Sequence, residues 1–279
     1  MAGFSPEWLG LREPADHAAR NPQVLGAVGA HFAGRGSLTV VDLGCGAGSN
    51  LRGTYAALPA RQHWTLVDHD ERLLAATRET LSGWADEARE QGEELVLTKG
   101  EHLITVDTRQ ADLNTDLEWV LGWQPDLVTA AALFDLTSRR WLERFVAGLT
   151  SLRLPLYTVL TYDGREIWQP PHPADAPMLA AFKHHQRGDK GFGPAAGPEA
   201  TDVMAEAFRK SGFAVSIGDS AWRLDARSGD LAQVLAKGIA EAVLETGQVD
   251  PATVAAWLAA KTPEAKALVG HHDLWARPV

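Results

Sequence analysis

Residues 40 to 50 constrain this chain more than any other stretch. Two valines lead into Asp42, and glycine then stands at every second position, at 44, 46 and 48. Glycine allows a sharp backbone turn and the close approach of a ligand. A helix-compatible run begins at Ser49, so the free N–H groups of a helix N-terminus would face the turn. The stretch therefore predicts a strand, a turn and a helix that together bind a nucleotide-like ligand.

The spacing of these glycines indicates which ligand they suit. The dinucleotide fingerprint is G-x-G-x-x-G, and its third glycine would fall on Ser49, whereas the chain places it at Gly48. The spacing disfavours a nucleotide-dependent oxidoreductase, which is kept as an alternative. Cys45, the single cysteine, lies inside the turn, where its small size suits the close packing. One cysteine cannot form an intramolecular disulfide, which agrees with a reducing compartment.

Charge and hydropathy narrow the class of partner. The 279 residues carry a formal net charge of −10, and the basic residues are scattered along the chain. Proteins that bind a phosphate backbone usually cluster Lys and Arg, so a small-molecule partner is expected rather than a nucleic acid. No segment resembles a signal peptide or a membrane span, so we expect a cytoplasmic protein without a membrane partner.

Apolar strands alternate with helical segments along most of the chain. This alternation predicts an α/β, doubly wound, Rossmann-like fold, with a seven-stranded, mostly parallel sheet and helices on both faces. Strands are expected at 37–43, 64–68, 94–113 (a hairpin or a bulged strand), 126–134, 154–161, 213–224 and 273–277. Residues 3–34 are expected to be helical, with a second helix starting at Pro14. Another helix is expected after a cap at Asp70. Further helices are expected at 116–123, 138–150, 174–186 and 198–211, with two or three more within 228–269.

Prolines and glycines interrupt this alternation after the fifth strand. We therefore divide the chain into an N-terminal helical cap at 1–34, a core at 35–162 and 198–279, and an inserted lid or substrate segment at 163–197.

Asp68 stands at the expected end of the second strand. A carboxylate there can accept hydrogen bonds from both ribose hydroxyls of a nucleoside bound across the sheet edge. The alternative is a helix N-cap, for which Asp70 is better placed.

The order of these features resembles class I S-adenosylmethionine-dependent methyltransferases. The resemblance covers residues 40 to 136: D-x-G-x-G-x-G from Asp42, then Asp68, then Asp112 at the end of the third strand, then the apolar run from Asp126 to Leu136. It implies S-adenosyl-L-methionine as the cofactor and S-adenosyl-L-homocysteine as its product.

The resemblance also implies residue roles. Asp112 would contact the adenine, unless it is a solvated turn residue, and Asp135 would face the methyl-transfer pocket. Arg12 would bind the methionyl carboxylate, or else pair with Glu13 or Asp16 at the surface. The expected cofactor-binding residues are Arg12, Asp42, Gly44, Cys45, Gly46, Ser49, Asn50, Asp68, His69, Asp112, Leu113 and Ala132.

Residues 184 to 194 gather titratable side chains and glycines and suggest a mobile loop that contacts the acceptor. The alternative is a polar hinge with solvated histidines. The catalytic candidates for accepting a proton are His185, Tyr162 and Asp135. The expected substrate-binding residues are Trp8, His184, Arg187 and Lys190, whose cations suit an anionic group on the acceptor. No metal site is expected, and His271 and His272 are expected in a surface turn.

Together these features predict methyl transfer from S-adenosylmethionine to an O or N nucleophile of a small-molecule metabolite. The alternative from another class is a non-catalytic S-adenosylmethionine-binding module.

Overall fold

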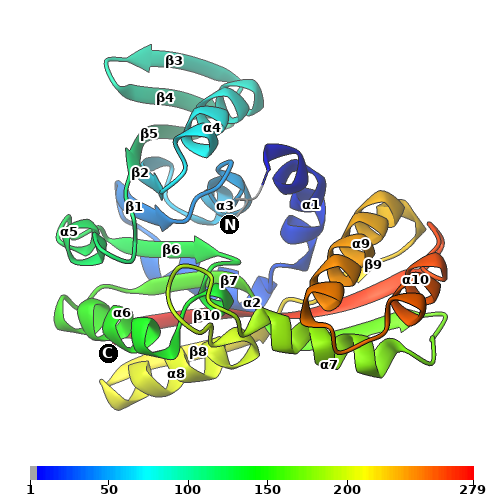
Figure 1. The fold of residues 1–279 in the computed structure, drawn as a ribbon. Helices are drawn as coiled ribbons and strands as arrows, with labels where there is room; N and C mark the ends of the chain where they lie inside the picture. The colour runs from blue at the N-terminus through cyan, green and yellow to red at the C-terminus, as the bar shows by residue number, and fades with distance from the viewer. Residues whose placement is uncertain (1–4) are drawn as a thin grey trace.

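The computed structural model describes residues 5–279, so the first residues of the expected N-terminal helix, 3 and 4, lie outside the described part. Two helices begin the fold, α1 (Pro6–Ala19) and α2 (Pro22–Phe32) (Figure 1). The prediction that Pro14 starts a second helix is wrong, because Pro14 lies inside α1. The second helix instead begins after Asn21, whose side chain accepts a hydrogen bond from Val24 N at 3.1 Å and so caps it.

One sheet of ten strands runs through the described residues in the order β3-β4-β5-β2-β1-β6-β7-β10-β8, with β9 beside β10. The strands β5, β2, β1, β6 and β7 pair in parallel, and the remaining pairs are antiparallel. The strand bounds are β1 (Leu38–Leu43), β2 (Arg61–Asp68), β3 (Glu87–Gln91), β4 (Glu94–Lys99), β5 (His102–Gln110), β6 (Leu127–Ala131), β7 (Leu156–Gln169), β8 (Phe213–Asp219), β9 (Trp222–Leu224) and β10 (Lys266–Pro278).

The predicted doubly wound, mostly parallel sheet is confirmed in its central strands. The seven expected strands correspond to β5, β2, β1, β6, β7, β10 and β8, and the expected hairpin at 94–113 is β4 and β5. The sheet differs from the prediction in two places: β3 extends it at one edge, and the single strand expected at 213–224 is divided into β8 and β9, which both pair with β10. The sequence gives no sign of β3, since its residues are all exposed and it forms by pairing with β4.

Helices cover both faces of the sheet and enclose two apolar clusters. One cluster includes residues of α2, α4, α7, α9 and α10, and the other includes residues of α5, α6 and α8. No helix in residues 5–279 is long and apolar enough to cross a membrane. The bounds of the remaining helices are α3 (Ser49–Thr54), α4 (Glu71–Trp84), α5 (Leu117–Leu121), α6 (Arg139–Ser151), α7 (Asp175–Gln186), α8 (Ala200–Lys210), α9 (Gly229–Thr246) and α10 (Pro251–Ala259).

Strands β7 and β10 are longer than predicted and form one antiparallel ladder. β7 does not end at residue 161 but continues to Gln169, and β10 begins at Lys266, where a helix was expected. The ladder runs from the Lys266–Gln169 pair to the Ala276–Leu156 pair, with two register shifts. It extends past the ends of β1 and β6, and α7, α9 and α10 surround this extension (Figure 1). Sheet pairing therefore reaches residues 163 to 169 of the predicted insertion.

Candidate functional site

The glycine turn lies at the carboxyl end of β1. Gly44, Gly46 and Gly48 have φ of +62°, +54° and +73°, a conformation that costs other residues free energy. The Cys45 N–H donates to Val67 O at 2.9 Å, and the Gly46 N–H donates to Asp68 Oδ2 at 3.0 Å. The turn is thus fixed to the end of β2, as the sequence predicts for a ligand-binding corner.

Asp68 orders this corner. Its side chain is buried, and Oδ1 accepts from Asp70 N at 3.0 Å while Oδ2 holds Gly46. Asp70 caps α4 through Arg72 N at 2.9 Å, so the cap assigned to Asp70 is confirmed. Each carboxylate oxygen has two lone pairs, so Asp68 retains acceptor capacity for a ligand. The neighbouring His69 is exposed, with Nδ1 3.2 Å from Asp68 Oδ1.

A buried network of hydrogen bonds next to the glycine turn joins α3 to β1, β6 and Arg20. Asn50 Nδ2 donates to Asp42 Oδ1 at 2.7 Å and to Thr129 Oγ1 at 2.9 Å. Its Oδ1 accepts from Arg20 at 2.9 Å, and Arg20 also reaches Thr54 Oγ1 at 2.9 Å. Burial raises the pKa of Asp42 to about 7, against the opposing effects of Asn50 and Arg20. Arg20 is not among the predicted site residues, because only its burial against α3, more than 25 residues later in the chain, distinguishes it from other arginines.

Cys45 is buried, and this burial, with the nearby charges of Asp68 and Asp42, raises the pKa of its thiol. A thiolate nucleophile is therefore disfavoured at this position.

Helix α1 lies over the turn and is held there by polar contacts. Glu13 accepts two hydrogen bonds from Arg52 at 2.7 and 2.5 Å, and His17 Nε2 lies 3.1 Å from Ser49 Oγ. A methyl group at Gly46 would meet Leu9 Cδ1 at 3.0 Å, so α1 packs closely against the turn. Trp8, in the first turn of α1, is half-buried.

Arg12 is engaged within α1. Its guanidinium donates to both carboxylate oxygens of Asp16, at 2.9 and 3.2 Å, and lies over the ring of Trp222 at 5.1 Å. The Trp222 indole N–H also donates to Asp16, at 3.0 Å. Arg12 is thus paired with Asp16, as the alternative interpretation expected, but the pair is largely buried and does not lie at the surface.

The end of β5 forms the next part of the site. Asp112 is exposed, and its Oδ1 accepts from Asn114 N at 2.8 Å. Leu113 is buried, and its carbonyl accepts from the indole of Trp141 at 3.0 Å. The ring of Phe192 packs on Trp141 at 5.3 Å, which brings the segment after α7 to this side of the sheet.

The segment after β6 carries Ala132 and Asp135. Ala132 has φ of +51°, unusual for a residue with a side chain, and its N–H donates to Val159 O at 3.0 Å. Asp135 is 8% exposed, and its Oδ1 has no hydrogen-bond partner among residues 5–279. Burial raises the pKa of Asp135 to about 6, while the Tyr162 backbone and the charge of Arg12 oppose this.

Five residues from different parts of the chain lie near one another, and we call them the acceptor cluster: Arg12, Asp135, Tyr162, Trp222 and His271. Trp222 packs on His271 at 5.2 Å between ring centroids, and His271 packs on Tyr162 at 6.2 Å. The Tyr162 hydroxyl donates to Glu166 at 3.2 Å, and burial raises the pKa of Tyr162 well above the usual range.

His271 and His272 correct a prediction, because both lie in strand β10 and neither lies in a surface turn. His272 pairs with Thr161 of β7. His271 stands in β10 opposite Tyr162 and is 6% exposed. Burial lowers its pKa to about 3, and the charge of Arg12 adds to this, so the imidazole is neutral near pH 7. The local pattern gives little sign of a strand here, because Gly270, the two histidines and Asp273 separate the apolar Val269 and Leu274.

The expected residues of the insertion lie elsewhere. His184 is exposed on α7, and His185 Nε2 is 3.0 Å from Glu245 on α9. Arg187 pairs with Glu199 at 3.1 Å, and Lys190 is half-buried. Of the three catalytic candidates, the structure brings Asp135 and Tyr162 together and gives His185 a partner on α9.

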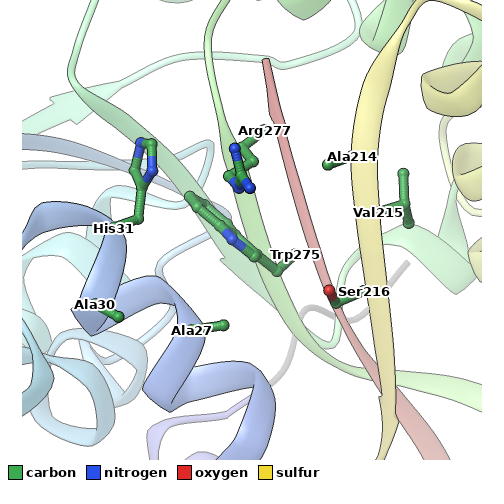
Figure 2. Close-up of a pocket in the computed structure, with 8 residues that line it drawn as sticks. All are labelled: Ala27, Ala30, His31, Ala214, Val215, Ser216, Trp275 and Arg277. Atoms are coloured by element: carbon green, nitrogen blue, oxygen red, sulfur yellow. The ribbon is translucent and has the colours of Figure 1, made fainter. Parts of the chain in front are cut away.

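A cavity of about 560 Å³ lies on a different part of the molecule (Figure 2). It is bordered by α2, β8 and β10, and Trp275 in its wall pairs with Tyr157 near the start of β7. The glycine turn, by contrast, is at the carboxyl end of β1, so this cavity is not the predicted site. Its lining residues are Ala27, Ala30, His31, Ala214, Val215, Ser216, Trp275 and Arg277.

Three potential metal ligands lie together on neighbouring strands. His63, Glu94 and Asp107 offer ligand atoms within 4.8 Å of one another, and His63 Nε2 is already 3.0 Å from Asp107. They stand on β2, β4 and β5, and all three are half-buried. They lie outside the glycine turn and the acceptor cluster.

Comparison with solved structures places the fold. A cyclopropane-fatty-acyl-phospholipid synthase-like protein from Lactobacillus casei is 13% identical over 97% of this chain and 94% of its own, with a TM-score of 0.57. A cyclopropane synthase from Mycobacterium tuberculosis is 12% identical over 98% of this chain and 95% of its own, with a TM-score of 0.51. No protein-family model and no curated protein matches the sequence. The fold is therefore the Rossmann-like α/β fold that the sequence predicts, and it is shared with a putative methyltransferase from Bacillus halodurans that is 11% identical over 92% of this chain and 100% of its own, with a TM-score of 0.52.

Proposed function

We propose that the protein is an S-adenosylmethionine-dependent methyltransferase acting on an O or N nucleophile of a small-molecule acceptor. The observation that carries the proposal is the corner in which Asp68 holds Gly46 at the carboxyl end of the parallel strands. This is the place where α/β sheets of this kind bind nucleoside ligands. The methyltransferase fold supports the choice of ligand.

The residues present fit the cofactor. At Gly44, Gly46 and Gly48 a side chain would meet Leu133, Leu9 and Thr77 at 3.0 to 3.3 Å, so the turn requires glycine. Asp68 would bind the ribose, and Asp112 with Leu113 would flank the adenine. The turn N–H groups and Ala132 would border the methionyl part. Arg12 would bind the methionyl carboxylate only after leaving Asp16. We therefore assign this role to Arg12 only in a state in which α1 has moved away from the glycine turn.

The bound cofactor would supply a methyl group on a sulfonium, which is already activated for transfer. The protein then has to position the acceptor, exclude water and accept a proton. Asp135 is suited to accept the proton, because its pKa of about 6 lies close to neutral pH. Tyr162 stays protonated and donates to Glu166, so it orients neighbouring groups.

Calorimetry with S-adenosylhomocysteine tests the cofactor. We expect binding to the wild type and at least tenfold weaker binding to Asp68→Ala, because the ribose would lose a charged acceptor. Asp202→Asn, which removes an exposed charge on α8, is the matched control. Absence of binding at millimolar ligand, or full affinity in Asp68→Ala, would sink the proposal.

Turnover separates an enzyme from a non-catalytic binding module. Formation of S-adenosylhomocysteine with a metabolite extract supports the enzyme. If the insertion binds an anionic part of the acceptor, Arg187→Ala and Lys190→Ala should raise KM. His185→Gln should lower kcat only if His185 leaves Glu245 to act as a base.

A further inference from the structure

We infer that the acceptor cluster binds an amine and that its nitrogen is the atom methylated. This inference rests on the proposed function. The cluster is continuous through ring contacts: Arg12 lies over Trp222, Trp222 packs on His271, and His271 packs on Tyr162. The backbone of Tyr162 and the charge of Arg12 both act on Asp135, which closes the set.

Two buried polar atoms of this cluster have no partner in the described part of the chain: Asp135 Oδ1 and His271 Nδ1. Asp135 is 8% exposed and His271 is 6% exposed, so neither side chain is broadly open to solvent. Buried polar atoms are normally hydrogen-bonded, and leaving one unpaired costs free energy. A ligand that donates hydrogen bonds would satisfy both atoms, because a carboxylate and a neutral imidazole each provide an acceptor.

The charges around the cluster favour a basic nitrogen over an anion. Arg12 is compensated by the bidentate pair with Asp16, and Asp163 is paired with Arg165 at 2.7 Å. Glu166, which accepts from Tyr162, and Lys183 act on each other as opposite charges. Asp135 is the carboxylate of the cluster itself, and it has no ion pair with a cationic side chain among residues 5–279.

The walls of the cluster suit the same ligand. The rings of Trp222, Tyr162 and Phe182 present aromatic faces and edges, with Phe182 at 6.2 Å from Tyr162. Aromatic rings attract ammonium groups, whereas a carboxylate or phosphate would meet Asp135 as a like charge. A neutral primary amine would donate one N–H to Asp135 and the other to His271, and it would keep its lone pair for the methyl carbon.

The reaction balances without a further reactant. The nitrogen lone pair forms the new N–C bond, the C–S bond breaks with its electron pair left on sulfur, and the proton lost by nitrogen passes to the Asp135 carboxylate. His271 is a positioning residue, because it holds the second N–H and thereby aligns the lone pair with the methyl carbon.

The test uses the wild-type protein, a metabolite extract and S-adenosylmethionine carrying a trideuterated methyl group, with mass analysis of labelled products. We expect the label on nitrogen. Label on oxygen, carbon or sulfur, or no labelled amine although S-adenosylhomocysteine binds, would overturn the inference alone. Failure of S-adenosylhomocysteine to bind would instead overturn the proposed function.

Variants then test the two residues with the labelled amine as substrate. His271→Gln should raise KM at least tenfold with little change in S-adenosylhomocysteine affinity. Asp135→Asn should lower kcat at least 100-fold and remove the acidic limb of the pH profile. Asp202→Asn is the control, and it should leave both constants unchanged. An unchanged KM in a folded His271→Gln protein would contradict the positioning role, whatever the behaviour of Asp135→Asn.

Discussion

Replacing Asp42 with asparagine should change how the stability of the protein depends on pH. Asp42 is fully buried below the glycine turn, and burial raises its pKa from 3.8 to about 7. A carboxyl group with a raised pKa binds a proton more tightly in the folded state than in the unfolded state. The stability that this group contributes to the folded state is therefore fully present below its pKa in the unfolded state, and it is lost as pH rises through its pKa in the folded state.

The magnitude follows from the shift. Between the two pKa values the free energy of unfolding falls by about 1.4 kcal/mol per pH unit from this group alone. From pH 5 to pH 8 the free energy of unfolding of the wild type should thus fall by about 2.5 kcal/mol more than that of Asp42→Asn. The amide can still accept from Asn50, which donates to Asp42 Oδ1 at 2.7 Å in the wild type, so the network is largely kept.

Urea unfolding at pH 5, 6, 7 and 8, followed by tryptophan fluorescence, measures this difference. Asp126→Asn is the control. Burial acts to raise the Asp126 pKa, but the hydrogen bonds from Thr39 and Arg35 outweigh it and lower the pKa. Asp126 is then ionised in both states over this range and should leave the slope unchanged. Equal slopes for wild type and Asp42→Asn would refute the reasoning.

Three further substitutions test the packing of the site, each by its urea midpoint. Gly53→Ala should destabilise by about 1–3 kcal/mol, because the new Cβ would lie 2.5 Å from Nε of Arg20; an unchanged midpoint would contradict this. Gly46→Ala should cost about 1–2 kcal/mol from its φ of +54°, and adding Leu9→Ala should recover only the steric part. Trp222→Phe removes the indole N–H that donates to a buried carboxylate of α1 at 3.0 Å, and a loss of about 1–3 kcal/mol is expected; a variant as stable as the wild type would show that this bond contributes nothing.

The central fold was predictable because its signals are local. The residues at 40–50 are enough to predict a strand, a turn and a helix. A buried strand such as 126–134 is predicted by its run of apolar residues. The Asp70 cap was also readable, because it depends on backbone groups two residues away. These elements appear in the structure close to their predicted bounds.

The errors arise where distant segments decide the structure. β7 continues past Tyr162 because β10 supplies its hydrogen-bond partners, more than 90 residues later in the chain. The same pairing buries His271, which by itself resembles a surface residue. At Pro14 a local signal was misapplied, since the helix start lies at Pro6 and tertiary contacts of Glu13 and Asp16 hold α1 together across the proline.

The β7–β10 ladder also bears on how a ligand enters. A continuous antiparallel ribbon joins the sheet to the layer of α7, α9 and α10, and bending it would break a row of backbone hydrogen bonds at once. This layer is therefore a poor hinge. Helix α1 instead contacts the turn through a few side chains, among them Glu13 with Arg52 and His17 with Ser49. Its departure would expose the corner by breaking side-chain contacts and no backbone ladder, so amide exchange should be faster in α1 than along the ribbon.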